Sequence, residues 1–115
     1  MADQLNISTR VRITIVNEDA EERTGMGLGA ATLLEKVVEL GSLNAAAKSM
    51  GMAYTKAWKL IRACEASLGC ELLVRDGARG SSLTENGARL LAAYRTTVDE
   101  VTAYAAERFS ANLNG

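Results

Sequence analysis

Residues 42–68 read SLNAAAKSMGMAYTKAWKLIRACEASL, which is two helical segments with a glycine between them. The hydroxyl of Ser42 suits the N-cap of a short first helix. Small apolar residues give that helix its packing face: Ala45, Ala46, Ala47 and Met50. Gly51 stands at a turn position that favours a positive φ, and a second helix is predicted from about residue 53 to residue 68. Helix, tight turn and helix in this order predict a helix-turn-helix.

The second helix of this motif is expected to carry a cationic outer face. With about 3.6 residues per turn, its buried positions are Ala57, Ile61, Cys64 and Leu68. The side chains expected to point outward, and hence toward a DNA duplex, are Tyr54, Thr55, Lys56, Lys59 and Arg62. Since lysine and threonine can bond base edges and cations neutralise phosphates, we expect Arg62 on phosphate and the other four in the major groove. An ordinary solvated helix face is the alternative interpretation.

An alternating pattern precedes this motif. Apolar or β-branched residues alternate with polar ones and predict a strand with one buried face: Ile7, Thr9, Val11, Ile13 and Ile15. A single strand must pair, and the expected partners are residues 72–74 and the return near residues 82–83. Residues 17–25 are polar and acidic and predict a loop. Helical apolar spacing follows over residues 28–40, and Gly41 marks the helix end.

The segment after the motif predicts a β-hairpin and then a long helix. Arg75 and Arg79 frame a short, glycine-bearing tip from which they could reach the minor groove or its phosphates; a solvated hairpin is the alternative. Thr84 can cap a helix from about residue 85 to residue 109. Apolar residues on this helix step by three and four, a pattern that predicts pairing with another helix and hence a dimer: Leu91, Tyr94, Val98, Val101 and Ala105.

The composition of the 115-residue chain, 48% of it apolar, fits one domain. The net charge of −1 argues against nucleic acid, but residues 42–82 hold six basic and three acidic residues. Trp58, Cys64 and Cys70 are expected to be buried or partly buried apolar residues, Trp58 in the core. Because the chain has no histidine, no metal site and no cofactor are expected. Neither a signal peptide nor a membrane span is predicted, so we expect a cytoplasmic protein.

These features predict an α+β, mostly α-helical fold: a winged helix-turn-helix with a small antiparallel sheet and a long C-terminal dimerisation helix. We expect residues 1–115 to form one such domain, with the helix-turn-helix at about 42–68, the wing at about 72–84 and the dimerisation helix at about 85–109. An enzyme is not expected, because the glycines at residues 25–29 lack the strand order of a dinucleotide fold and no nucleophile and base pair is evident. A winged helix that binds a separate effector-binding subunit is the alternative.

Four motifs of this chain resemble the winged-helix domain of ModE-type molybdate-responsive regulators: Gly41-Ser42-Leu43-Asn44-Ala45-Ala46-Ala47, Met50-Gly51-Met52, Ala57-Trp58 and Leu83-Thr84-Glu85-Asn86-Gly87. They also resemble, more distantly, LysR-type regulators, which have the same Leu-Thr-x-x-Gly motif at the start of a dimerising linker helix. The resemblance implies a homodimer on an inverted-repeat operator, with the hairpin as the wing. The chain departs from that family in ending at Gly115, so we expect the C-terminal oxyanion-binding domains to be missing and do not expect a small-molecule effector. Ala53 departs from the serine usual at that position.

Overall fold

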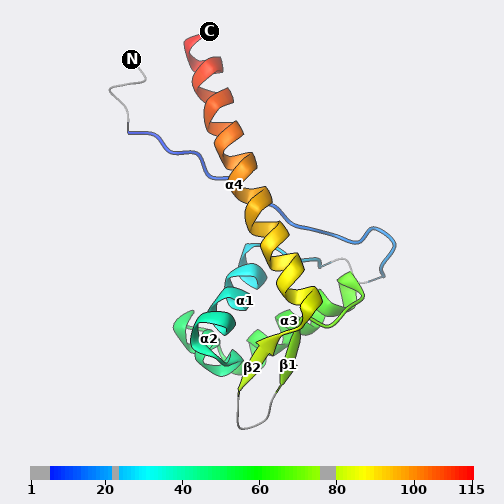
Figure 1. The fold of residues 1–115 in the computed structure, drawn as a ribbon. Helices are drawn as coiled ribbons and strands as arrows, with labels where there is room; N and C mark the ends of the chain where they lie inside the picture. Colours follow the sequence, from blue (N-terminus) through cyan, green and yellow to red (C-terminus); the bar gives the residue numbers. More distant parts are fainter. Residues whose placement is uncertain (1–5, 22–23, 76–79) are drawn as a thin grey trace.

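The computed structural model describes residues 6–21, 24–75 and 80–115. Its elements, in chain order, are α1 (Leu28–Leu40), α2 (Leu43–Ser49), α3 (Tyr54–Leu68), β1 (Leu73–Arg75), β2 (Ser81–Leu83) and α4 (Glu85–Asn114) (Figure 1). β1 and β2 form an antiparallel pair in which Leu73 lies opposite Leu83 and Arg75 opposite Ser81. The α+β, mostly α-helical winged helix-turn-helix that the sequence predicts is confirmed.

α1 ends, and α2 and α4 begin, at the predicted capping residues. Gly41 ends α1 with a left-handed φ of 85°, and its N–H donates to the Val37 carbonyl at 2.8 Å. The Ser42 hydroxyl accepts from the Ala45 N–H at 3.0 Å at the start of α2. The Thr84 hydroxyl accepts from the Gly87 N–H at 2.9 Å at the start of α4. Each side-chain cap satisfies a backbone group that the helix leaves unpaired, and it stabilises the helix by about 1 kcal/mol.

The turn between α2 and α3 depends on the backbone of two small residues. Gly51 has a φ of +64°, and an added Cβ there would meet nothing within 4 Å. The Met52 N–H donates to the Ala47 carbonyl at 2.9 Å, and Ala47 itself is buried. Glycine is therefore needed at position 51 for its backbone conformation rather than for lack of space.

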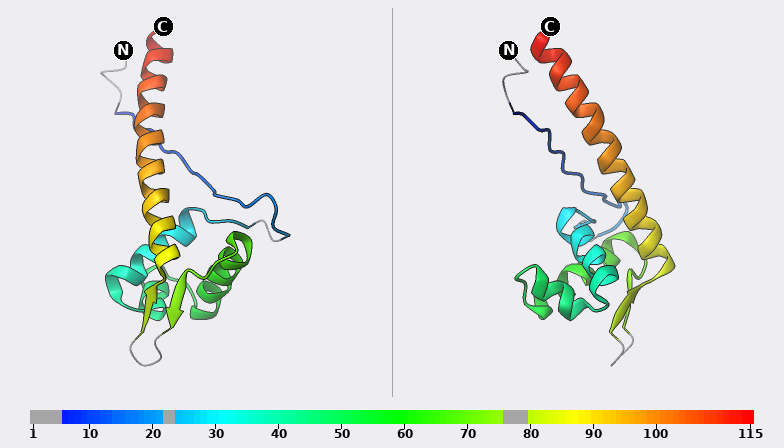
Figure 2. Two further views of the ribbon diagram at one scale, coloured as in Figure 1. Left: turned by 45° about the vertical axis from the view of Figure 1, so that its right-hand side comes forward. Right: turned by 60° about the vertical axis from the view of Figure 1, so that its left-hand side comes forward.

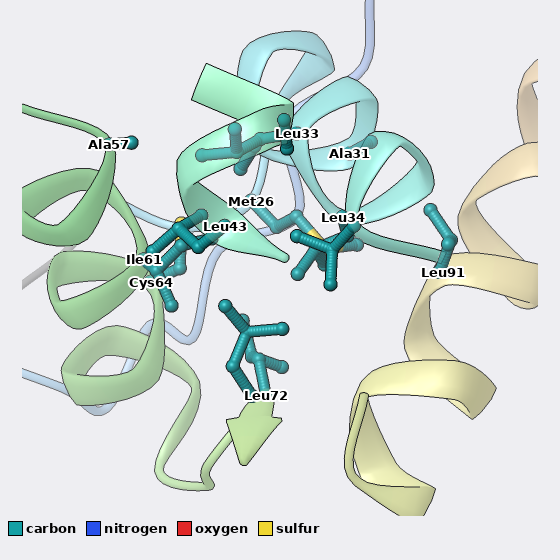
Figure 3. Packing of buried hydrophobic residues seen from close by; sticks show 14 of the residues in the cluster. Met26, Ala31, Leu33, Leu34, Leu43, Ala57, Ile61, Cys64, Leu72 and Leu91 are labelled. Carbon is teal, nitrogen blue, oxygen red and sulfur yellow. The ribbon is translucent and has the colours of Figure 1, made fainter. Parts of the chain in front are cut away.

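One apolar core joins the helices to the hairpin (Figure 3). Every helix, the hairpin and the segment before α1 contribute side chains to it, among them Met26, Leu33, Leu34, Leu43, Ile61, Leu72 and Leu91. Six of these seven are at most 1% exposed, and each such side chain contributes about 1.5–3 kcal/mol of burial free energy. This core fixes the relative positions of α2, α3 and the hairpin.

The sequence predicts a strand over residues 7–15 that pairs with the hairpin, and this predicted pairing is wrong. This segment is extended but forms no ladder with β1 or β2; within the described residues its one bridge joins Ile15 to Met26, with N···O distances of 2.8 and 2.9 Å. Figures 1 and 2 show the segment running beside α4, where the Tyr94 hydroxyl donates to the Ile13 carbonyl at 2.9 Å. The loop predicted to follow is confirmed, apart from residues 22–23, which lie outside the described residues.

Each edge of the hairpin is contacted by another part of the chain. Beside β1, the Glu65 carboxylate of α3 accepts from the Leu72 and Leu73 N–H groups at 2.8 and 3.4 Å. Beside β2, the Ser81 N–H donates to the Gly41 carbonyl at 3.1 Å. These contacts cover part of each edge, and within the described residues the N-terminal segment pairs with Met26 instead.

α4 extends well beyond the core and gives the molecule its elongated shape, with extents of 56 × 33 × 22 Å (Figure 2). It runs to Asn114, past its predicted end at residue 109. At its base, an added Cβ at Gly87 would clash with the Leu72 carbonyl, and Arg95 forms an ion pair with Glu35 of α1. No helix in the described part of the chain has both the length and the apolarity needed to cross a membrane.

Candidate nucleic-acid interface

α3 presents the cationic face that the sequence predicts. Thr55, Lys56, Lys59 and Arg62 are all exposed. On the opposite side of the helix, Ala57, Ile61 and Cys64 have no exposed surface. The helix is therefore fixed by one face and offers the other to a partner.

The C-terminal end of α3 departs from the predicted buried stripe. Leu68, expected to be buried, is only partly buried, whereas Ser67 is completely buried. The Ser67 hydroxyl accepts a hydrogen bond from the Gly25 N–H at 3.0 Å, so this polar group is paired in the core. The exchange shifts the buried face by one residue at the last turn and leaves the cationic face unchanged.

Trp58 packs against the core, as the sequence predicts, but part of its side chain stays exposed. Its side chain is partly buried and packs against the edge of the core, because position 58 lies beside the buried stripe rather than within it. Two guanidinium groups lie over its ring: Arg62 at 4.8 Å and Arg75 at 5.2 Å from the ring centroid. Arg75 also lies 5.9 Å from the ring centroid of Tyr54. The two aromatic residues of α3 thus contact the hairpin through Arg75.

A cavity of about 380 Å³ lies between the start of α2, the start of α3 and the hairpin. Its lining is polar and apolar in about equal parts, and the polar side chains are Ser42, Asn44, Tyr54, Arg75 and Ser81. Sequence reasoning found Tyr54 and Arg75 but missed Asn44 and Ser81, because a tertiary contact between β2 and Gly41 brings them together. Arg79, also predicted to contact DNA from the hairpin, lies outside the described residues.

The predicted dimer seam on α4 is only partly available to a second chain. Leu91 and Tyr94 are 9% and 2% exposed because they pack into the core of their own chain, which leaves little of either side chain for a second chain. Val98 is partly buried against the same core. Val101 is 39% exposed and Ala105 is half-buried. Exposed apolar side chains continue toward the end of the helix: Tyr104, Phe109 and Leu113.

The cysteines show no features of a reactive or metal-binding site. Burial, and to a lesser extent the neighbouring charge of Glu65, raises the pKa of the Cys64 thiol from 9.0 to about 11, so the thiol stays protonated at neutral pH. Cys70 is a partly buried free thiol. Within the described residues, no cluster of three His, Cys, Asp or Glu side chains could hold a metal ion.

The surface formed by α3 and the hairpin offers cations, hydroxyls and aromatic rings, which suit a polyanion.

The fold and this surface define a winged helix-turn-helix protein with a cationic second helix in its motif. The chain belongs to the lysR family of bacterial regulatory helix-turn-helix proteins, whose family model matches residues 28–88, just over half of the chain. It is also similar to the molybdenum-pterin-binding protein MopB of Rhodobacter capsulatus, with 34% identity over 79 residues. That match covers 64% of this chain but only 29% of MopB.

Two solved structures share the fold at comparable identity. One is a CbnR_DBD–DNA complex, with a TM-score of 0.60 and 29% identity, covering 74% of this chain and 95% of that chain. The other is CbnR, a LysR family transcriptional regulator, with a TM-score of 0.57 and 30% identity. It covers 72% of this chain and 28% of that chain. These similarities confirm the winged-helix architecture.

Proposed function

We propose that this protein is a transcriptional regulator that binds double-stranded DNA sequence-specifically through α3 and the hairpin. The observation that carries the proposal is the face of α3 formed by Thr55, Lys56, Lys59 and Arg62, exposed directly opposite the buried stripe that fixes the helix. A helix fits the major groove, where lysine reaches guanine acceptors and threonine can bond a base or contact a thymine methyl group. The lysR family membership and the likeness to a CbnR_DBD–DNA complex support it.

The side chains divide between the two parts of a DNA contact. Tyr54, Thr55, Lys56 and Lys59 face base edges and specify sequence, while Arg62 binds a phosphate. Arg75 and Arg79 bind phosphates or the minor groove from the hairpin. Phosphate contacts fix the register of the protein on the duplex, and base contacts give the specificity.

We further propose that residues 1–115 act as one domain and form a homodimer through α4, on an inverted-repeat operator. Support comes from the apolar surface of the distal half of α4, where Val101, Tyr104, Phe109 and Leu113 are 39–64% exposed. Apolar surface of this kind gains free energy when a second chain covers it. Val98 and Ala105 lie beside this surface and complete the contact.

A ModE-type regulator is the narrower assignment that we propose within the family. The similarity to MopB supports it, as do the Ala57-Trp58 pair and the Leu83–Gly87 motif. The chain spans 29% of the length of MopB. A role linked to molybdenum is therefore part of the proposal and does not follow from the similarity itself.

The proposal is tested by selecting duplexes from a random pool on the purified protein. We expect enrichment of one inverted repeat, with half-sites spaced by about one helical turn. The double variant with Lys56→Ala and Lys59→Ala is the matched control protein. The same selection on this variant is expected not to enrich the inverted repeat. If the parent enriches no duplex, the function proposed is wrong.

A second candidate function is protein contact with a separate effector-binding subunit. The net charge of −1 favours it, because most DNA-binding domains of this size are basic. Failure to bind any duplex, together with a stoichiometric complex with another protein, would support this function instead.

A further inference from the structure

We infer that Trp58 is a positioning residue that holds Arg62 of α3 and Arg75 of the hairpin as a pair of phosphate contacts. This inference rests on the proposed DNA-binding function and deepens it. It makes the hairpin and the second helix of the motif one binding unit rather than two independent ones.

The geometry places both cations on a single ring. The Arg62 and Arg75 guanidinium carbons lie 4.8 and 5.2 Å from the Trp58 centroid, both within the range of cation–π attraction. Tyr54, one turn earlier on α3, lies 5.9 Å from the Arg75 guanidinium carbon. Arg75 is therefore held by two aromatic side chains of a helix to which it does not belong.

A guanidinium that lies over a ring keeps its bonding capacity. Its N–H groups lie in the plane of the cation, so they remain free to donate in pairs to a phosphate. Lysine is a poorer substitute here, because an ammonium group lacks both the planar face and the paired donors. The ring thus restricts the positions of the two guanidinium groups and leaves their N–H donors free for a phosphate.

The carboxylates near Arg62 and Arg75 do not engage the two guanidinium groups. Within residues 6–21, 24–75 and 80–115, no carboxylate forms an ion pair with Arg62 or Arg75. Glu65 and Glu71 line the same cavity of about 220 Å³, but the Glu65 carboxylate already accepts from the Leu72 and Leu73 N–H groups. Two cations beside one ring repel each other, and a phosphate between or beside them offsets that repulsion.

The contact explains why a large aromatic residue stands at a position that is only partly buried. Trp58 packs one part of its ring against the core and leaves the rest to the arginines. Tryptophan offers the strongest cation–π face of the side chains. A residue needed only to cover the core edge would work equally well as leucine, which gives the inference a direct test.

The test measures binding of a labelled mixed-sequence duplex by fluorescence anisotropy, because phosphate contacts do not depend on sequence. Trp58→Leu should weaken binding about tenfold, whereas Trp58→Phe, which keeps an aromatic face, should stay within about threefold of the parent. Arg75→Ala should weaken the parent clearly but have little further effect in the Trp58→Leu background. Circular dichroism at the assay temperature establishes that each variant is folded.

Arg75→Lys provides a second measurement that leaves Trp58 in place. This substitution keeps the positive charge and removes the planar guanidinium group. A reduction of the DNA affinity by about threefold therefore supports the inference, and an unchanged affinity contradicts it. Equal binding by Trp58→Leu and the parent, equal losses in Trp58→Leu and Trp58→Phe, or an Arg75→Ala effect of the same size in both backgrounds would also overturn it. If the parent binds no duplex, the proposed function fails as well, which separates that outcome from the others.

Discussion

Lys56 and Lys59 are the residues at which function and stability separate most cleanly. Both are exposed on α3, and neither belongs to the core or to its partly buried surround. Lys56→Ala and Lys59→Ala are each expected to weaken operator binding by about 1–3 kcal/mol, since a base contact has about that value. Titration of the selected duplex measures the loss. The unfolding midpoint should stay within the range of Lys36→Ala, a charge-matched control on α1, and a parallel drop in midpoint would show that the placement is wrong.

The buried thiol of Cys64 gives the fold a measurable response to alkaline pH. Its pKa is raised from 9.0 to about 11, so the folded state keeps a proton that the unfolded state loses above about pH 9. The stabilisation is therefore complete below pH 9 and is lost as pH rises through 11, by about 2–3 kcal/mol.

Two measurements check this behaviour. Denaturant titrations at increasing pH should show a loss of stability for the parent that is smaller in Cys64→Ala. At about pH 8, below the ordinary thiol pKa, a thiol reagent should modify Cys70 well before Cys64 in the folded protein. Equal rates for the two cysteines would contradict the burial of Cys64.

Among the elements, the turn and the base of α4 use glycine for different physical reasons. Gly51 has a positive φ with open space around it, whereas Gly87 is helical and lies against the Leu72 carbonyl. Gly51→Ala should therefore cost about 1–2 kcal/mol through backbone strain alone. Gly87→Ala should cost more, about 3 kcal/mol, because α4 must move away from the hairpin. Denaturant unfolding measures both, and the reverse order would contradict the close approach of α4.

The elements that local chemistry specifies are the ones that the sequence predicts. Ser42, Gly51 and Thr84 each act within a few residues of themselves, so the helix-turn-helix and the start of α4 can be located from the sequence. The N-terminal segment cannot, because its alternation reports a half-buried extended chain and not the identity of its partner. The surroundings of Trp58 are only half accessible to sequence reasoning: Arg62 follows it by four residues on the same helix, whereas Arg75 reaches the ring only through the tertiary contact between α3 and the hairpin.

At the scale of the whole molecule, the same spacing on α4 has two uses. Leu91 and Tyr94 pack the helix onto its own core, while the distal half is left with exposed apolar residues. A periodic seam predicts that a helix has a partner, but it does not distinguish a partner in the same chain from one in a second chain.

Val101→Asp tests whether the distal half of α4 forms the dimer contact. A carboxylate in an apolar interface should weaken dimerisation by more than about 3 kcal/mol, roughly 100-fold, and shift the protein to a monomer in sedimentation equilibrium. Val38→Asp is the matched control, because Val38 is 64% exposed on α1. A dimer of unchanged stability in Val101→Asp would place the contact elsewhere.

The salt dependence of duplex binding tests the DNA-binding surface most directly. If Arg62 and Arg75 of both protomers bind phosphates, the logarithm of the association constant should fall linearly with the logarithm of salt concentration, with a slope of about −3.6 or steeper. Arg62→Ala should make the slope shallower by about 1.8, because each dimer then neutralises two fewer phosphates. A slope near zero, or one that Arg62→Ala leaves unchanged, would contradict the assignment of α3 and the hairpin as the DNA-binding surface.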